Sequence, residues 1–308
     1  MGGTLRGLET RQRKGKNNNQ AATGATGAAK VSTAADGSTI IDDSVVINGL
    51  TMRFKISAPA TELVSATNAA APGKLGLNVL FHGDGGQSFQ DFPNQGVNAN
   101  LMGVALLSPD AGRRWGGSDR GGVVRPDGAA HSAAVNELLT KVLPTKVNFD
   151  AKNINLEGVS GGSLLLSGFL LPTFGASLGV PAAVLGCGGL APQVAVQGDL
   201  SALRLHFQST TNELAGLKKD IPQALLAYEK LITDPAKLTA DASPKGDHCA
   251  FDERGFVSGV QLLTDNFAGV VAGTGQLNGV AVAKVCTHPL SPLLASLEVR
   301  ADLGESLL

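Results

Sequence analysis

The amino-acid sequence predicts an α/β fold whose sheet is largely parallel and covered by helices on both faces. Short apolar runs alternate along the chain with longer segments whose apolar residues have helical spacing, and several of these runs end in glycines. Parallel strands packed on both faces are apolar almost throughout, as the runs KLGLNVLF, MGVALL and PAAVLG are. A chain of 308 residues, of which 43% are hydrophobic, can bury one large core. We therefore expect a single α/β domain.

The beginning of the chain predicts no packed structure. Residues 1–38 are rich in Gly, Ala, Asn, Gln and Thr and have no apolar period, so they lack the apolar surface that would offset the entropy lost on ordering. We expect a disordered leader over 1–38 and a catalytic domain over 39–308. Five basic residues and one acid fall in the first sixteen positions. Such a run could bind an acidic partner, or be a solvated tail or pro-peptide.

Local patterns predict the elements of the domain in order. TIIDDSVVINGLTMRFKISAPA alternates apolar and polar residues around Asn48-Gly49, which predicts an antiparallel hairpin. Beyond it, the strand-like runs are KLGLNVLF, MGVALLSP, NINLE, PAAVLG and LRLHFQST. The helix-like segments are AAHSAAVNELLTKVL, SLLLSGFLL, PQALLAYEKLI and FVSGVQLLTDNF. KLTADASPKGDH is a poor strand, and the tail after Phe267 is too rich in glycine to assign.

Charge and hydropathy exclude several classes of partner. The 25 Lys and Arg residues nearly balance the 26 Asp and Glu residues, so no global basic field would attract nucleic acid. No stretch approaches the roughly 20 uninterrupted apolar residues of a membrane span. The first 20 residues lack the apolar run of a secretory signal. The low charged fraction and the RQRK stretch, a candidate processing site, nevertheless favour a secreted protein from which such a signal is missing.

A nucleophile motif lies between a predicted strand and a predicted helix. Gly158-Val159-Ser160-Gly161-Gly162 has the pattern G-x-S-x-G, in which the serine occupies a sharp strand-to-helix turn and its hydroxyl projects above the sheet. Flanking glycines let the strand and the helix approach without a Cβ clash. Such a pentapeptide also arises by chance in a chain with 40 glycines. Its position after NINLE and before SLLLSGFLL favours Ser160 as a nucleophile.

On this motif the chain resembles the α/β-hydrolase superfamily over residues 75–250, and the resemblance implies the α/β-hydrolase fold. In that family the strand two before the elbow ends in His-Gly, and backbone N–H groups after it form half of an oxyanion hole. The matching stretch here is His82-Gly83-Asp84-Gly85-Gly86. The resemblance implies Asp84 and Gly161 as the two donors to the negative oxygen of a tetrahedral intermediate, with the next glycine as the alternative to Asp84. A plain glycine turn is the competing interpretation. The family's histidine braces this loop, so this one is expected to be structural.

The resemblance also implies the order nucleophile, acid, histidine. His206 lies inside a predicted strand, so two later histidines are candidates for the general base. His248 lies in a short loop with a glycine, which resembles the loop that delivers the family's base, whereas His288 precedes a proline in the late tail. We prefer His248, which would take the Ser160 proton and return it to the leaving group.

The acid that orients this base is expected just past the run LRLHFQST. Glu213 is the first carboxylate there, with Asp220 and Asp247 as competitors. The other interpretation of Glu213 is an ordinary acid at a helix N-terminus, where the helix dipole favours it.

A glycine-rich loop after MGVALLSPD carries candidate substrate-binding residues. Arg114 and Trp115 lie there, at the edge where ligands bind in open α/β sheets, and a solvated loop braced by Arg and Asp pairs is the alternative. The order Trp, helix, elbow is similar to secreted feruloyl esterases, acetylxylan esterases and polyhydroxybutyrate depolymerases. This resemblance implies ester rather than peptide substrates.

The three cysteines permit one disulfide and one free thiol, and their spacing matches no zinc site. We expect Cys249 to pair with Cys286, because that bond would fix the loop of His248 where no strong strand does. Cys187 would then be a buried free thiol. The competing pairing is Cys187 with Cys249. We expect no metal and no cofactor.

Together these patterns predict a carboxylic ester hydrolase that acts through an acyl-Ser160 intermediate on a small-molecule or polymeric ester. The acyl and alcohol groups of that ester and the oligomeric state do not follow from the sequence. A lipase, a thioesterase or a peptidase could use the same residues. The alternative from another class is a catalytically silent hydrolase fold that serves as a binding protein.

Overall fold

The computed structural model describes residues 24–25, 29–34, 36–68, 72–92, 97–117, 122–272, 276–277 and 280–281. The strands of its main sheet are β1 (Gly24–Ala25), β2 (Lys30–Thr33), β3 (Thr39–Ile47), β4 (Leu50–Ala58), β5 (Gly76–Phe81), β6 (Val97–Asn98), β7 (Leu101–Leu107), β8 (Ile154–Val159), β9 (Ala182–Gly186), β10 (Arg204–Gln208) and β11 (Leu238–Asp241). A separate two-stranded ribbon consists of β12 (Gln276–Leu277) and β13 (Val280–Ala281).

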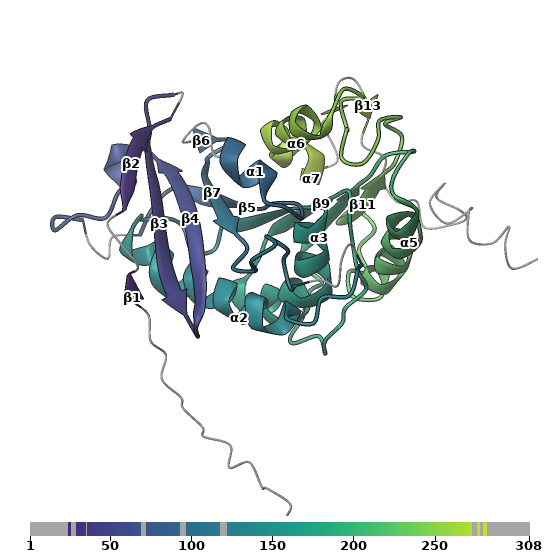
Figure 1. Ribbon diagram of the computed structural model, residues 1–308, viewed down its shortest axis with the longest axis horizontal. Helices are drawn as coiled ribbons and strands as arrows, with labels where there is room; N and C mark the ends of the chain where they lie inside the picture. Colours follow the sequence, from purple (N-terminus) through teal and green to yellow (C-terminus); the bar gives the residue numbers. More distant parts are fainter. Residues whose placement is uncertain are drawn as a thin grey trace, which may run out of the picture.

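The helices of the described chain connect these strands. They are η1 (Ala60–Glu62), α1 (Gln87–Asp91), α2 (Gly128–Glu137), η2 (Leu138–Val142), η3 (Leu143–Thr145), α3 (Gly161–Leu165), η4 (Leu166–Gly175), α4 (Ala176–Leu178), α5 (Ala215–Glu229), α6 (Phe256–Asp265) and α7 (Phe267–Ala272). In Figure 1, α2, α3 and α5 lie on one side of the sheet, and α1, α6 and α7 lie on the other.

The strand order of the main sheet is β1-β3-β4-β7-β5-β8-β9-β10-β11, with β2 on β3 and β6 on β7. The pairs β3–β4 and β4–β7 are antiparallel, whereas every pair from β7 through β5 to β11 is parallel. A mostly parallel sheet between two helical layers is the fold class that the sequence predicts.

The predicted hairpin is confirmed at Asn48-Gly49. These two residues have φ of 51° and 82°, the pair of positive values that a two-residue turn between twisted strands requires. Ile47 pairs with Leu50 directly across the turn. Asn and Gly adopt this conformation with little strain, so the turn sets the register of β3 on β4.

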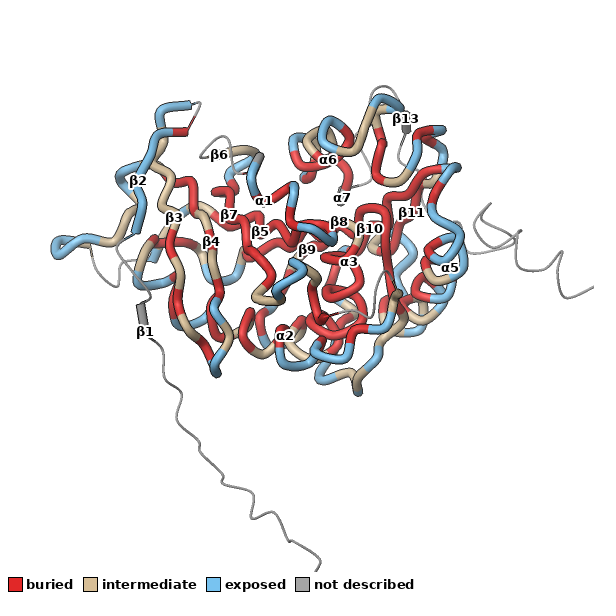
Figure 2. The backbone as a smooth tube through the Cα atoms, in the orientation of Figure 1, coloured by how far each residue is buried: buried red, intermediate tan, exposed pale blue. Residues whose placement is uncertain are grey.

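Two apolar clusters lie on the two faces of the sheet, which is why its central strands are buried throughout (Figure 2). In β5, Leu77, Val79 and Phe81 belong to the cluster that includes α2, η4 and α5 residues. Leu80 belongs to the other cluster, with residues of α6 and α7. Side chains that alternate between two buried faces produce the continuous apolar run seen in the sequence.

The sheet extends into the predicted leader. Within 1–38, β1 and β2 pair antiparallel with β3, although we predicted disorder there. All four residues of β2 are exposed, so this strand is held by backbone pairing with β3 and not by burial of its side chains. A strand without a buried face has no alternation of apolar and polar residues by which its sequence could predict it. Residues 1–23, 26–28 and 35 lie outside the described residues. The boundary between leader and domain near residue 39 therefore stays a prediction.

The carboxyl edge of the parallel strands gathers the residues that the sequence singled out. His82 follows β5, Ser160 follows β8, and Glu213 lies in the loop after β10. His248 follows β11, a strand that the weak pattern of KLTADASPKGDH did not predict. β11 pairs in parallel with β10, from Leu205↔Leu238 onward, and its four residues are buried. Four residues are too few to show the alternation of apolar and polar residues typical of a strand. This segment forms a strand because it pairs with β10.

One helical stretch of the described chain is long and apolar enough to span a membrane. It is Gly161–Leu178, of which 78% is buried inside the fold. A core helix has this character, and its burial against the sheet accounts for its hydropathy.

Candidate active site

Ser160 lies on a sharp turn between β8 and α3. Its backbone has φ 49° and ψ −113°, an uncommon conformation for a residue with a Cβ, which persists only where the surrounding structure holds it. A Cβ on Gly162 would lie 2.1 Å from the carbonyl oxygen of Phe81. Only glycine therefore lets the helix approach β5 this closely. The turn has the strand-to-helix geometry that G-x-S-x-G predicts.

Three side chains from separate loops meet in one hydrogen-bonded line. Ser160 Oγ lies 2.9 Å from His248 Nε2, and His248 Nδ1 contacts Glu213 Oε1. A carboxylate only accepts hydrogen bonds, so Nδ1 carries the ring proton and donates a hydrogen bond to Glu213. Nε2 is then free to accept the hydrogen bond of the serine hydroxyl. The His248 side chain is 22% exposed and that of Glu213 is 1% exposed, so the acid is buried while the imidazole reaches solvent.

The competing residues do not occupy these places. Among the described residues, neither Asp220, which lies within α5, nor Asp247 contacts the His248 ring. His206 is buried in β10, where it bonds Thr239 Oγ1, and burial lowers its pKa to about 4. His288 lies outside the described residues.

The loop after β5 brings one backbone N–H beside the elbow. A Cβ built on Gly161 would lie 3.3 Å from Asp84 N, so the backbones of these two residues are neighbours. The alternative donor, the N–H of Gly85, bonds the carbonyl oxygen of Arg113 at 3.0 Å and is therefore occupied. A role of the Asp84 and Gly161 N–H groups as the two oxyanion donors stays a prediction.

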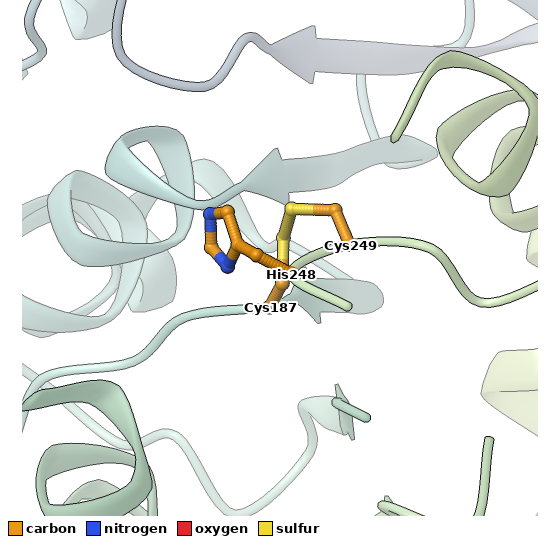
Figure 3. A group of neighbouring side chains, drawn as sticks. All are labelled: Cys187, His248 and Cys249. Atoms are coloured by element: carbon orange, nitrogen blue, oxygen red, sulfur yellow. A yellow bond between two sulfur atoms is a disulfide. The ribbon is translucent and has the colours of Figure 1, made fainter. Parts of the chain in front are cut away.

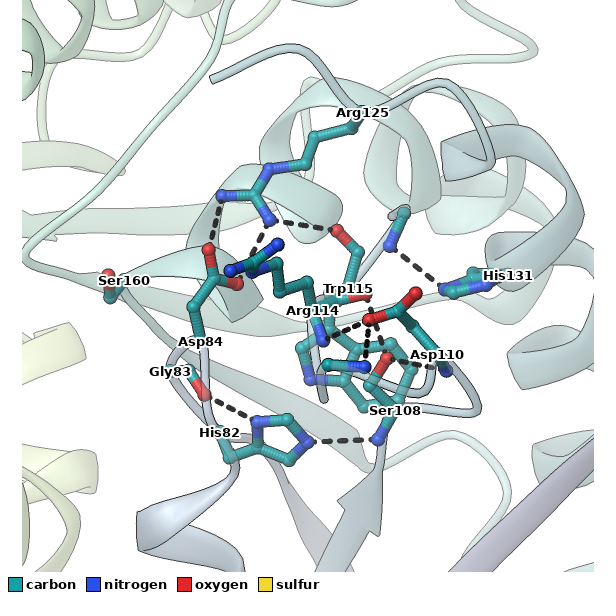
Figure 4. A network of polar contacts seen from close by, with 12 residues as sticks. His82, Gly83, Asp84, Ser108, Asp110, Arg114, Trp115, Arg125, His131 and Ser160 are labelled. Carbon is teal, nitrogen blue, oxygen red and sulfur yellow. Dashed lines mark hydrogen bonds and ion pairs between the residues drawn. The ribbon is translucent and has the colours of Figure 1, made fainter. Parts of the chain in front are cut away.

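His82 holds this loop from beneath (Figure 4). The backbone N–H of Ser108 donates to His82 Nε2 at 2.9 Å, so Nδ1 carries the ring proton and donates to the carbonyl oxygen of Gly83 at 2.6 Å. Burial lowers the pKa of His82 to about 4, which keeps the ring neutral and preserves these two roles. That carbonyl belongs to the same planar peptide as the Asp84 N–H, so His82 has the structural position expected of it.

Sequence reasoning missed Arg125. Its guanidinium forms two hydrogen bonds of 2.9 Å to the carboxylate of Asp84, one to each oxygen, and a third of 3.2 Å to the carbonyl oxygen of Trp115 (Figure 4). Its partner is 41 positions away in the sequence. No local pattern could have found a pair that only folding brings together.

The predicted substrate contact of Trp115 is wrong. Its side chain is fully buried and packs against Phe81, His82 and His131, with ring centroids 5.2, 5.4 and 6.3 Å away. A large aromatic ring contributes more by filling the core beneath the loop than by facing solvent. Arg114 is half-buried, and its backbone N–H donates to Asp110 Oδ2 at 3.2 Å. A substrate contact of Arg114 stays a prediction.

The disulfide joins Cys187 to Cys249, so the predicted Cys249–Cys286 pairing and the free thiol at Cys187 are both wrong (Figure 3). Cys187 follows β9, and its Cα lies 5.1 Å from that of Cys249, well within the span that a disulfide bridges. The end of β9 lies at the same sheet edge as the histidine loop, which brings the two cysteines together. Cys286 lies outside the described residues.

Cys187, Cys249 and His248 have metal-binding atoms within 4.8 Å of one another. The two sulfur atoms are bonded to each other, and both ring nitrogens of His248 have partners. The cluster therefore joins the histidine loop to β9 and does not offer thiolates to a metal ion.

A small groove of about 10 Å³ lies between α1 and α6. Its lining residues are Ser88, Phe92, Phe256, Val257, Val260, Gln261 and Thr264. Phe256 links the groove to the elbow, since a Cβ on Gly83 would lie 3.3 Å from Phe256 Cζ and 3.4 Å from Ser160 Cβ. Its walls are partly apolar, and a space of this size has room for about one water molecule.

Comparison with known proteins finds similarity among solved structures. No protein-family model matches the chain, and no curated protein matches it. The Bacillus cereus carboxylesterase is 19% identical, covers 57% of this chain and 84% of its own, and has a TM-score of 0.46. A carboxylesterase from Mesorhizobium loti is 15% identical, with 73% and 98% covered and a TM-score of 0.48. A structure described for two prolyl endopeptidases is 12% identical, with 79% and 44% covered and a TM-score of 0.44.

This chain has the α/β-hydrolase fold. Its own sheet order and elbow support that statement: the antiparallel hairpin β3–β4 precedes the parallel strands, and Ser160 lies on the turn after a central strand. The roles of individual residues are inferred only from distances and contacts within this chain.

Proposed function

We propose that this protein is a carboxylic ester hydrolase that acts through an acyl-Ser160 intermediate. The observation that carries the proposal is the line of contacts from Ser160 Oγ through His248 to Glu213. A serine hydroxyl is a weak nucleophile unless a base accepts its proton. The arrangement supplies that base, and it supplies a carboxylate to hold the base in one tautomer.

In the proposed reaction, Ser160 Oγ attacks the ester carbonyl while His248 Nε2 takes the hydroxyl proton. The N–H groups of Asp84 and Gly161 would donate to the oxygen that becomes negative. Collapse of the tetrahedral intermediate breaks the bond to the alcohol, which takes its proton from His248. Water, activated by the same imidazole, then releases the acid and restores Ser160.

An ester is preferred over a peptide because the order of Trp, helix and elbow is similar to that of secreted esterases. A lipase, thioesterase or peptidase would use the same attack. The contacts from Ser160 through His248 to Glu213 argue against a silent binding protein. A disulfide next to the histidine loop supports secretion, since such bonds persist in oxidising compartments.

The test is hydrolysis of p-nitrophenyl butyrate by the full chain and by Ser160→Ala. We expect the variant to lose activity by more than about 10³-fold, because the nucleophile is gone, and to keep its melting temperature. Ser177→Ala, which changes an exposed serine of α4, is the matched control and should retain full activity. A fluorophosphonate probe should label the wild type and not Ser160→Ala. Activity of Ser160→Ala within tenfold of wild type would refute the assignment.

A further inference from the structure

The loop that carries a candidate oxyanion donor also carries an acid. A Cβ built on Gly161 would lie 2.0 Å from Asp84 Oδ1 and 3.3 Å from Asp84 N. The carboxylate and both candidate N–H donors therefore occupy the same corner of the site. In the proposed reaction the carbonyl oxygen of the substrate becomes negative at this corner. A carboxylate without a counter-charge would repel that oxygen.

Arg125 supplies the counter-charge and holds it in a defined place. Its side chain is 3% exposed, whereas that of Asp84 is 27% exposed. Both carboxylate oxygens accept a hydrogen bond of 2.9 Å from the guanidinium, in the fork geometry that Lys cannot reproduce. Nη1 also donates to the carbonyl oxygen of Trp115, which ties the cation to the packed floor of the loop.

The acid and the donor belong to one residue, so fixing one helps to fix the other. His82 holds the Gly83 carbonyl on one side of the Gly83–Asp84 peptide, and Arg125 holds the side chain on the other. A peptide plane restrained at both ends keeps its N–H in one direction before the substrate arrives. Such preorganisation is what makes an oxyanion donor effective.

We propose that Arg125 is a positioning residue for the oxyanion hole, which holds the N–H of Asp84 toward the reacting carbonyl and neutralises the Asp84 carboxylate. This inference rests on the proposed ester hydrolysis. Arg125 touches neither Ser160 nor His248 and acts through Asp84. Its effect falls on the transition state, because the ground-state carbonyl carries little charge, and so it concerns kcat more than KM.

The chain contains a matched control for this ion pair. Arg53 forms the same kind of fork with Asp42, at 2.8 and 2.7 Å, between β4 and β3. That pair joins two strands of the antiparallel half, away from the elbow (Figure 1). Arg53→Met removes an Arg–Asp fork without touching the oxyanion loop, so it shows whether the loss of such a fork elsewhere in the sheet lowers kcat.

The experiment compares Arg125→Met, Asp84→Asn, the double variant and Arg53→Met in hydrolysis of p-nitrophenyl butyrate. We expect Arg125→Met to lower kcat about 10²-fold, the loss typical of one oxyanion donor, with KM within about threefold of wild type. Adding Asp84→Asn should restore roughly tenfold in kcat, since the unpaired charge is gone. Arg53→Met should stay within about twofold of wild type.

Two results would overturn the role of Arg125: a folded Arg125→Met with kcat within twofold of wild type, or a double variant no faster than Arg125→Met. If Arg125→Met does not fold, Arg125→Lys replaces it, because Lys keeps the charge and loses the fork. A folded Arg125→Lys should lose about tenfold in kcat, and an unchanged kcat would contradict the proposal. A wild type that neither hydrolyses the ester nor reacts with a fluorophosphonate would instead contradict the proposed function.

Discussion

The two halves of the sheet differ in where their polar residues lie. In the antiparallel half, β3 alternates buried and half-buried residues from Asp43 onward, and its polar groups form ion pairs with neighbouring residues, as Asp42 does with Arg53. In the parallel half, all residues of β5 and β8 are buried. Strands covered on both faces leave little room for polar chemistry along their length. The candidate site therefore forms where these strands end.

The largest test of this difference is to alter one acid in each half. Glu213→Gln should lower kcat by about 10⁴-fold, because the amide no longer selects the tautomer in which Nδ1 of His248 carries the proton. Asp42→Asn, in β3, removes an ion pair of the antiparallel half and should leave kcat within about twofold. Steady-state hydrolysis of p-nitrophenyl butyrate measures both. A loss of less than tenfold for Glu213→Gln would mean that another carboxylate serves His248.

The disulfide sharpens the comparison, because it crosslinks only the parallel half. Cys187 and Cys249 are 62 positions apart, and on the loop-entropy account a loop of that size stabilises the fold by about 4 kcal/mol. The double variant Cys187→Ser/Cys249→Ser should lose free energy of unfolding of that order in urea denaturation. Its kcat should also fall, since the His248 loop is released from β9.

A control and a direct assay accompany this prediction. Mass mapping of a non-reduced digest should recover the Cys187 and Cys249 peptides joined. Cys286→Ser should leave the urea midpoint unchanged if the bond does not involve Cys286. A digest in which Cys249 is joined to Cys286 would contradict the assignment.

The smallest expected effect concerns an acid inside a parallel strand. Glu157 of β8 is fully buried, accepts hydrogen bonds from Thr264 Oγ1 at 2.7 Å and Asn78 Nδ2 at 3.1 Å, and has no cationic partner among the described residues. Burial raises its pKa to about 7 from the usual 4.5. Asp43 of β3 is also buried, but it pairs with Lys146 at 2.7 Å. The parallel half thus retains an acid without a counter-ion.

The sign of the pH dependence follows from which state binds the proton. Between pH 4.5 and 7 the folded protein keeps the Glu157 proton, while the unfolded chain releases it. The stabilising contribution of Glu157 to the free energy of unfolding is therefore full below about pH 4.5 and is lost as the pH rises through about 7. The free energy of unfolding lost over this pH range is about 3 kcal/mol. Glu157→Gln should flatten this fall in unfolding free energy. An unchanged pH slope in the variant would show that Glu157 does not titrate in this range.

Sequence patterns determined the parts of the protein that depend on near neighbours. The hairpin at Asn48-Gly49, the turn at Ser160 and the apolar central strands all follow from contacts between residues close in the chain or from burial on two faces. The resemblance to the α/β-hydrolases added the order of the site residues, and that order predicted His248 and Glu213 as the partners of Ser160.

Only the tertiary structure decided what depends on distant partners. Arg125 meets Asp84 across 41 positions, Cys187 rather than Cys286 meets Cys249, and Trp115 turns into the core instead of the cleft. β2 and β11 likewise form by pairing with neighbours, not by a pattern of their own. These outcomes have one physical reason. They depend on which distant backbones the sheet brings side by side, and a local pattern of apolar residues does not depend on those neighbours and so cannot predict them.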